Sequence, residues 1–361
     1  MKNFKFNAIT ALIIGVNVAV ANAADGNILN ITTQDAVNAN KTIEATNVKG
    51  PGHTAIGQQN QIYSIPAAEA EESQGSSSAI GNQNVVKGEQ ANAIGDGNDA
   101  YGHFTQSVGD DNKVYADHSL GYGAHNKVGA QRVIGTPEKD VVVDKNTSKA
   151  SVFGLNNVVL GKEVLALGNN NNVNGENSTA IGTQSTADGI NALAIGVGAK
   201  AHVTNPAAAN SNKPGNLVAI GTSAEATAAE TVAIGESAKA LKANANAFGS
   251  KSLAGGESSL AVGSGAQATA NNAVAVGRVN KATNTSAVAL GVNNQANGQD
   301  STAVGSTNTV SGDQSSAFGR ENTVNAGAGQ LAVGYKNKTT GDRAIAIGEG
   351  NDSQVEDTIT M

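Results

Sequence analysis

The segment AIGTSAEATAAETVAIG, from Ala219 to Gly235, decides the fold of this chain. A triplet of a small residue, an apolar residue and glycine opens the segment and returns at its end as Ala233-Ile234-Gly235. Every step between such glycines from Gly221 to Gly319 has the length of the step from Gly221 to Gly235. A fixed period is typical of a repeat architecture, in which each unit stacks on the next.

The triplet recurs along nearly the whole chain. Its glycines are Gly81, Gly95, Gly109, Gly121, Gly135, Gly154, Gly168, Gly182, Gly196, Gly221, Gly235, Gly249, Gly263, Gly277, Gly291, Gly305, Gly319, Gly334 and Gly348. The long steps predict insertions near residues 58–78, 136–151 and 202–216, and four of the five prolines lie there, because proline cannot donate to a central ladder. The short step from Gly109 to Gly121 predicts an irregular coil.

Within a repeat, the residues before the glycine alternate with the period of a strand. Val232 and Ile234 point one way while Ala233 points the other. A second short strand follows the glycine, with small residues three and five positions later, as in Ala224 and Ala226. Two strands and two turns in about 14 residues form one coil of a flattened roll, so we predict an all-β, parallel β-roll solenoid.

The first strand is apolar on both faces and therefore needs cover on both. A narrow interior suits alanine, which leaves the branched side chains as a ridge on the outside. Such a ridge is too large an apolar patch for a monomer, so another chain must cover it. The predicted chain–chain interface comprises Val232, Ile234, Phe248, Leu260, Val262, Val274, Val276, Val288, Leu290, Leu331, Val333, Ile345 and Ile347. This reasoning predicts an oligomer and leaves two, three or more chains open.

Composition supports a thin, exported fold. Glycine numbers 44, aromatic residues make up 3%, and cysteine and tryptophan are absent. The absence of cysteine excludes disulfides and thiol chemistry and argues against structural zinc. The net charge is −7, so a nucleic-acid partner is not expected, and no cofactor is predicted.

The N-terminal residues 1–23 have the pattern of a secretory signal peptide. Lys2 and Lys5 precede an apolar stretch, and Ala21-Asn22-Ala23 matches the small-x-small cleavage pattern. An amphipathic first helix is the alternative. We assign residues 24–54 to an N-terminal cap segment and residues 55–361 to the β-roll.

The repeats resemble the head of trimeric autotransporter adhesins over about residues 55–361. The resemblance rests on Ala-Ile-Gly at residues 93–95, 194–196, 219–221 and 233–235 and on the small residues that follow. It implies a left-handed parallel β-roll, a homotrimer, and a position at the tip of a fibre on the outer membrane. It also implies binding to matrix proteins such as collagen or fibronectin, or to host-cell receptors.

The family continues from its head into a stalk and a membrane anchor, and we find neither pattern in this sequence. Residues 359–361 fit the approach to a further glycine at the next period. We therefore expect a fragment of a longer adhesin, attached to the outer membrane only through an anchor that this sequence lacks.

No catalytic pattern is present. The five histidines have no metal-ligand spacing and are interpreted as solvated turn residues. Asp96 and Asp110 each follow a repeat glycine, and stacked coils would bring such carboxylates about 4.8 Å apart. Side chains directed into water explain them without a metal; a weak calcium site is the alternative.

Ligand contacts are predicted at two places. Aromatic residues gather in a short stretch as Tyr101, Phe104, Tyr115 and Tyr122. The insertion near residues 202–216 contributes His202, Asn205 and Lys213. The open alternatives are aromatic residues that only fill turns and the chain–chain seam, and a passive insertion.

The leading hypothesis is a host-adhesion module, and a structural spacer without its own ligand is the alternative. A β-helical enzyme is disfavoured because acyltransferase hexads do not fit the period of these repeats. An ice-binding solenoid is disfavoured because a regular threonine ladder is missing.

Overall fold

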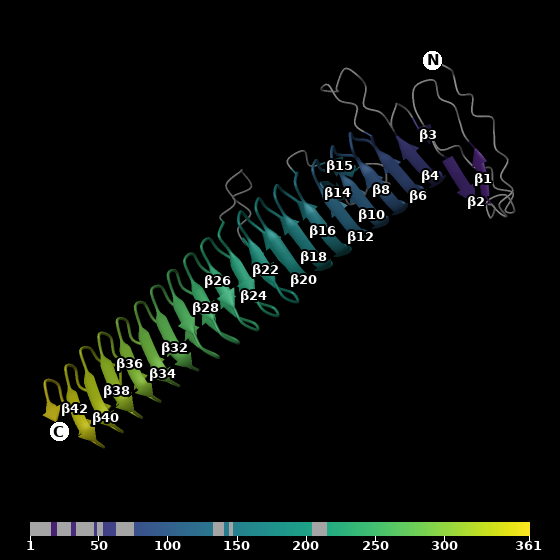
Figure 1. Ribbon diagram of the computed structural model, residues 1–361. Coiled ribbons are helices and arrows are strands. Elements are labelled where there is room, and N and C mark those ends of the chain that lie inside the picture. Colours follow the sequence, from purple (N-terminus) through teal and green to yellow (C-terminus); the bar gives the residue numbers. More distant parts are fainter. Residues whose placement is uncertain are drawn as a thin grey trace, which may run out of the picture. The chain divides into compact units, whose positions relative to one another are not determined.

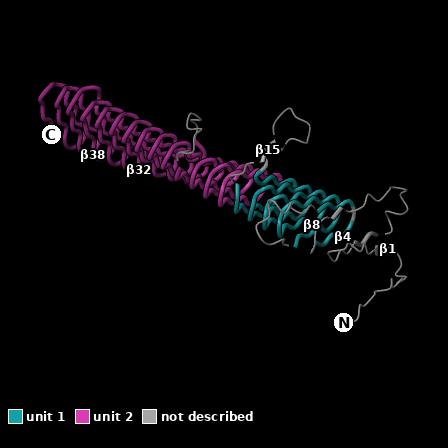
Figure 2. Tube along the Cα trace, turned by 90° about the horizontal axis from the view of Figure 1, so that it is seen from above, with its two compact units in different colours: residues 1–155 teal, residues 156–361 magenta. Residues whose placement is uncertain are grey.

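The structure is a computed structural model that describes residues 16–19, 30–33, 47–48, 53–62, 76–132, 141–143, 147–203 and 215–361. The chain divides into two compact units, unit 1 at residues 1–155 and unit 2 at residues 156–361 (Figure 2). All regular structure in the described residues is β-strand. No helix among them is long and apolar enough to cross a membrane.

Unit 1 contains two stacked series of parallel strands and two antiparallel pairs. Its first strands are β4 (Thr54–Gln58), β6 (Ser78–Asn82), β8 (Asn92–Asp96), β10 (Gln106–Asp110), β12 (Leu120–Ala124) and β16 (Ser151–Leu155). Its second strands are β3 (Asn47–Val48), β5 (Gln61–Ile62), β7 (Val85–Val86), β9 (Asp99–Ala100), β11 (Lys113–Val114) and β13 (Lys127–Val128). The antiparallel pairs are β1 (Val16–Ala19) with β2 (Asn30–Thr33), and β14 (Ala130–Arg132) with β15 (Val141–Val143).

Unit 2 contains the same two series. Its first strands are β18 (Leu165–Asn169), β20 (Thr179–Thr183), β22 (Leu193–Ile195), β24 (Val218–Ile220), β26 (Val232–Ile234), β28 (Asn246–Phe248), β30 (Leu260–Val262), β32 (Val274–Arg278), β34 (Val288–Val292), β36 (Thr302–Ser306), β38 (Ser316–Arg320), β40 (Leu331–Tyr335), β42 (Ile345–Glu349) and β44 (Ile359–Thr360). Its second strands are β17 (Val158–Leu160), β19 (Asn172–Asn174), β21 (Thr186–Asp188), β23 (Lys200–His202), β25 (Glu225–Ala226), β27 (Lys239–Ala240), β29 (Leu253–Ala254), β31 (Gln267–Ala268), β33 (Lys281–Ala282), β35 (Gln295–Ala296), β37 (Thr309–Val310), β39 (Thr323–Val324), β41 (Lys338–Thr339) and β43 (Asp352–Ser353).

Within each unit, every coil pairs in parallel with the coils before and after it, so the first strands form one ladder and the second strands another (Figure 1). The register joins equivalent positions of successive repeats, as in Ala289 with Ala303 and Gly291 with Gly305. This pairing confirms the predicted all-β parallel solenoid, in which one repeat forms one coil.

Alanine fills the interior, as predicted. Ala233 of the first strand and Ala238 and Ala240 around the second strand have no exposed surface. Val232 and Ile234, on either side of Ala233, point outward and stay partly exposed. The first strands thus bury a small side chain at most inward positions, whereas several second strands bury larger ones, including Ile62, Val86 and Val114.

The predicted irregular coil is wrong. Gly109 pairs with Gly123, one full period along the chain, and Gly121 pairs instead with Ser107 at an inward position. Gly123 then pairs with Gly154, and Gly135 lies outside the described residues. The sequence LGYG offers two glycines two residues apart, and only the second has the backbone that the turn requires, with a φ of 120°.

The insertion predicted near residues 136–151 ends earlier than its predicted boundary. The backbone N–H of Lys149 donates to the carbonyl of Asp117, and Ala150 is fully buried, so both belong to a coil. β14 and β15 lie between Val128 and Thr147 and form the antiparallel pair of this insertion. Most of the other two insertions, at residues 63–75 and 204–214, lies outside the described residues.

The leader and the cap segment are described only in part. β1 lies within the predicted signal peptide and pairs with β2 in the predicted cap segment, with Val16 opposite Thr33. Residues 1–15 and 20–29 lie outside the described part of the chain. The signal peptide and its boundary stay predictions.

Each regular coil turns through two residues in the left-handed region. One lies two positions after the repeat glycine and the other five positions before the next, as in Ser223 and Glu230. Asparagine, serine and glycine tolerate this backbone better than branched residues do. Val279 occupies such a position with a φ of 58° and is 39% exposed. Its backbone is therefore strained without any gain from burial.

Replacing Val279 with asparagine is expected to raise the free energy of unfolding by about 1 kcal/mol, because the left-handed backbone penalty of a branched residue is removed. Val292 supplies the matched control, since it is also 39% exposed but lies in the extended strand β34. Val292→Asn is expected to leave the denaturation midpoint nearly unchanged. Equal shifts for both variants would contradict the strain explanation.

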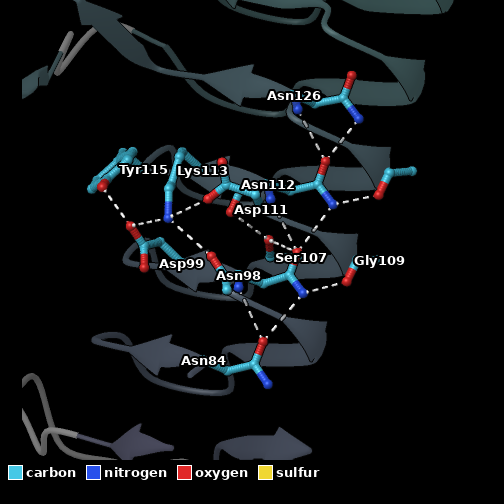
Figure 3. A network of polar contacts seen from close by, with 12 residues as sticks. Asn84, Asn98, Asp99, Ser107, Gly109, Asp111, Asn112, Lys113, Tyr115 and Asn126 are labelled. Carbon is cyan, nitrogen blue, oxygen red and sulfur yellow. Dashed lines mark hydrogen bonds and ion pairs between the residues drawn. The ribbon is translucent and has the colours of Figure 1, made fainter. Parts of the chain in front are cut away.

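A ladder of buried asparagine side chains runs beside the alanine core (Figure 3). Asn112 lies three residues after Gly109, and its Nδ2 donates to the carbonyls of Val108 and Gly123 at 3.1 and 2.8 Å. Its Oδ1 accepts the backbone N–H of Asn126 at 3.1 Å and Nδ2 of Asn126 at 2.8 Å. The Asn112 amide is thus satisfied between neighbouring coils, which is the condition for burying it.

The asparagine ladder has members in both units. They are Asn60, Asn84, Asn98, Asn112 and Asn126 in unit 1, and Asn157, Asn171, Asn280, Asn294, Asn308, Asn322, Asn337 and Asn351 in unit 2. The sequence analysis missed this ladder, although its signal is plain: an asparagine three residues after the repeat glycine.

Candidate functional site

The first candidate site is the ridge, which we define as the residues one and three positions before each repeat glycine. Its side chains point away from the alanine core along the first strands of both units. Those that remain most exposed are Ile94, Phe153, Leu167, Ile234, Phe318 and Ile347, at 36–44%. All residues of the predicted chain–chain interface lie on the ridge and are partly or largely exposed. An apolar surface that extends over so many coils is typical of a protein interface.

The predicted aromatic cluster is divided over three places on unit 1. Tyr101 and Tyr115 occupy equivalent positions of adjacent coils, just after the second strand, with ring centroids 4.6 Å apart and edge to face. The ammonium group of Lys87, in the preceding coil, lies 4.9 Å from the Tyr101 ring. Side chains from three adjacent coils thus form one continuous stack, in which the cation and the rings interact favourably.

Phe104 and His118 form the second place, on the turn that leads to the next first strand. Their rings are stacked with centroids 5.0 Å apart. Phe104 is 46% exposed and has a φ of 54°, an uncommon backbone for a bulky residue. Phe104 therefore combines a strained backbone with an apolar ring that contacts His118 and remains nearly half exposed, which makes it a candidate for recognition.

Tyr122 belongs to the ridge rather than to the turns that carry Tyr101, Phe104 and Tyr115. It lies one position before the repeat glycine Gly123, and its ring stacks on Phe153 of the next coil with centroids 5.5 Å apart. Its hydroxyl donates to Oε1 of Gln106, another ridge residue. Of the four predicted aromatic contacts, Tyr101, Phe104 and Tyr115 therefore lie on successive turns, and Tyr122 lies on the apolar face.

Lys113 is the centre of a polar network between adjacent coils of unit 1 (Figure 3). Its Nζ lies 3.2 Å from Oδ2 of Asp99, 3.0 Å from Oδ1 of Asp111 and 2.9 Å from the carbonyl oxygen of Gly97. The hydroxyl of Tyr115 donates to the same Asp99 oxygen at 2.8 Å. A lysine thus neutralises two carboxylates that would otherwise repel each other.

Burial and charge explain the titration of this network. Burial lowers the pKa of Lys113, but Asp99 and Asp111 outweigh it, so that this pKa lies above its ordinary value. Burial, followed by the charge of Asp99, raises the pKa of Tyr115. Lys113 therefore stays charged and Tyr115 stays a hydrogen-bond donor at physiological pH.

Replacing Lys113 with methionine is expected to destabilise unit 1 by about 2 kcal/mol, because the aliphatic stem remains while both carboxylates lose their charged donor. Lys239→Met is the matched control. Lys239 pairs with Glu225 at 3.2 Å but is half exposed, so its loss is expected to cost less than about 1 kcal/mol. Thermal denaturation compares the two, and equal losses would contradict the assigned role of Lys113.

Asp96 and Asp110 lie in register on adjacent first strands, as the sequence predicted. Both are exposed, and Oδ1 of Asp96 accepts a hydrogen bond of 2.9 Å from Nδ2 of Asn82. Among the described residues, no group of three or more histidine, aspartate or glutamate side chains could hold a metal ion. The nearby Asp99 and Asp111 are already paired with Lys113, so a calcium site has little support here.

The histidines differ in their surroundings. His53 is buried rather than solvated, which corrects the sequence interpretation, and its Nδ1 accepts the backbone N–H of Ser77 at 3.1 Å. Burial lowers the pKa of His53. His202 ends β23 at a partly exposed position. Asn205 and Lys213 lie outside the described residues, so the predicted contact of the three is untested.

Comparison with known families identifies the repeats of unit 2. The YadA head domain repeat matches residues 165–185, 174–199, 187–205, 218–238, 254–278, 282–308, 296–322 and 331–351. This part of the chain belongs to the YadA head repeat family. No curated protein matches the chain.

YadA head repeats are modules of surface-exposed autotransporter adhesins, so the family implies an adhesin-type role rather than a catalytic one. The fold agrees, because the matched segments lie in a parallel solenoid whose coils pair in register. Unit 1 lies outside the matched segments, yet its strands keep the same register of alanine and glycine, as in Ala79 with Ala93 and Gly81 with Gly95.

Proposed function

We propose that this chain is the head of a homotrimeric adhesin that attaches a bacterium to host tissue. The ligand is a matrix protein of the collagen or fibronectin kind, or a host-cell receptor, and binding involves no catalytic step. The chain is exported and held at the tip of a surface fibre. One observation carries this proposal: YadA head repeats build a stack whose apolar ridge is uncovered in the single chain.

The ridge supports assembly with identical chains. It follows the first strands, and its partner must therefore offer an equally long apolar surface of matching period, which a second copy does. A closed cyclic assembly places the same rung of each chain at the same height. Three chains around one axis would bury the ridge of each, as the YadA family leads us to expect.

The aromatic turns support ligand binding on the surface that remains outside. We use this name for the two stacked turns at residues 101–104 and 115–118 of unit 1. They carry Tyr101, Phe104, Tyr115 and His118, none of which belongs to the ridge. A trimer would repeat this surface three times, so weak contacts would add up through avidity.

A binding screen of the purified assembly against matrix proteins and host-cell receptors tests the function. The intact head should bind at least one of them, and Phe104→Ser together with Tyr101→Ser should weaken that binding at least tenfold. Ser286→Ala, at the equivalent turn position in unit 2, is the control. If the intact head binds none of the ligands, the chain is a spacer of the fibre and the adhesive proposal fails.

A further inference from the structure

The asparagine ladder of unit 2 is interrupted in the middle of the stack. After Asn171 the equivalent positions hold Ser185, Ala199, Ala224, Ala238, Ser252 and Ala266, and the ladder resumes only at Asn280. We call the coils whose repeat glycines run from Gly196 to Gly263 the alanine block. Ladder coils follow the block. In the coil directly before it, Oγ of Ser185 donates to the carbonyl of Gly196 at 2.7 Å, which replaces the asparagine bond there.

The alanine block has shorter strands than the coils that follow it. Its first strands, β22 to β30, comprise three residues each, whereas β32 to β42 comprise five. In β34 and β36 the pairing extends through the repeat glycine to the residue after it, as in Val292 with Ser306. In β26 and β28 it ends with Ile234 and Phe248, one residue before the glycine.

The asparagine bonds between coils are also missing from the described residues of the block. Oγ1 of Thr227 still donates to the carbonyl of Leu241 in the next coil at 3.3 Å, and Lys239 still pairs with Glu225 at 3.2 Å. Asn294 ties its coil to the next through Nδ2 to the carbonyl of Gly305 at 2.8 Å and through Oδ1 to the backbone N–H of Asn308 at 3.0 Å. In the block, the carbonyl of Gly235 instead accepts the backbone N–H of Ala238 in its own coil at 3.2 Å. That bond closes a turn and contributes nothing between coils.

We propose that the alanine block is the segment of unit 2 that opens first, while the ladder coils after it stay closed. In a solenoid each coil contacts only its neighbours, so local stability follows the strength of the local interfaces. One net hydrogen bond changes an opening equilibrium by roughly tenfold. Both the alanine block and the ladder coils after it carry apolar ridge residues. Assembly with other chains would therefore protect both segments from opening and preserve the difference in stability between them.

Early opening would have a use in an adhesin. A head held between a cell and its ligand carries tension along its stack, and a segment that opens before the rest would lengthen under load without releasing either end. This use rests on the proposed adhesive function, whereas the order of opening rests only on the hydrogen bonds of the fold. A failed binding screen would therefore leave the order of opening intact.

Hydrogen exchange of the unmodified full chain, followed by mass spectrometry, tests the order of opening. Backbone amides of β24 to β30 should exchange at least tenfold faster than those of β34 to β38. Both sets lie away from the end of unit 2, so fraying does not bias the comparison. Equal rates, or slower exchange in the block, would overturn the proposal.

A pair of variants tests the cause. Ala266→Asn places an amide next to Asn280, where the carbonyls of Val262 and Gly277 and the backbone N–H of Asn280 can complete a ladder step. It should slow exchange in β30 at least threefold. Ala268→Asn puts the same side chain at another fully buried position of the same coil, away from the ladder, and should accelerate exchange. If both variants accelerate exchange, the ladder does not set the order of opening.

Discussion

Replacing Val276 and Leu290 together with aspartate is expected to convert the assembled head into single chains. Both side chains lie on the ridge, in adjacent coils and in register. Burying a valine or leucine contributes about 1.5–3 kcal/mol per chain, and all of that would be lost. Around a symmetry axis the change would also bring carboxylates of several chains together without partners, which is strongly unfavourable.

Light scattering coupled to size-exclusion chromatography measures this result directly. We expect three chains per particle for the unmodified head and one for the double variant. Gln267→Asp together with Gln295→Asp is the control, because these residues lie on the second strands, where their side chains point away from the ridge. A double ridge variant that keeps the mass of the unmodified assembly would refute the proposed interface.

The regular spacing of the repeat glycines and the alternation of small and branched residues were sufficient to predict the fold, because each reflects a direct structural constraint. A coil that pairs with its neighbours over its whole length must repeat in register, so the spacing of Gly277, Gly291 and Gly305 translates into strand pairing. Alanine between two branched residues, as at Ala275, marks the inward position, which is fully buried. Both features are local in the sequence and need no tertiary information.

The repeat glycine was misassigned because a three-residue sequence pattern does not determine the backbone conformation of its glycine. Gly121 and Gly123 are equivalent as letters, but only one of them has a positive φ. Asparagine at Asn112 was overlooked because polar residues are expected outside, and only the stacking of coils supplies the partners that let it be buried.

The candidate site was harder to predict than the fold. The aromatic residues are close in sequence, but the coil directs Tyr101, Phe104 and Tyr122 to different positions around its circumference. Because the chain turns twice within each short repeat, residues that are close in sequence can lie on different sides of a coil. The sequence showed the carboxylates near the repeat glycines but not the role of Lys113, because that role depends on Asp99 in the preceding coil.

Replacing Gly291 with alanine is expected to lower the free energy of unfolding by about 3–5 kcal/mol. Gly291 has a φ of 119°, which side chains rarely adopt, and an added Cβ would overlap the carbonyl group of Gly305 in the next coil. Because that carbonyl also accepts Nδ2 of Asn294, the next coil cannot shift without breaking the ladder.

Gly265→Ala separates this clash from the cost of a positive φ. Gly265 has a φ of 67°, and the nearest atom to an added Cβ would be Cγ2 of Val279 at 3.7 Å, which is an ordinary contact. Its expected loss is about 1 kcal/mol, from the left-handed backbone alone. Denaturant unfolding measures both variants, and similar losses for the two would show that backbone preference, not the close approach of stacked coils, fixes glycine at the turn.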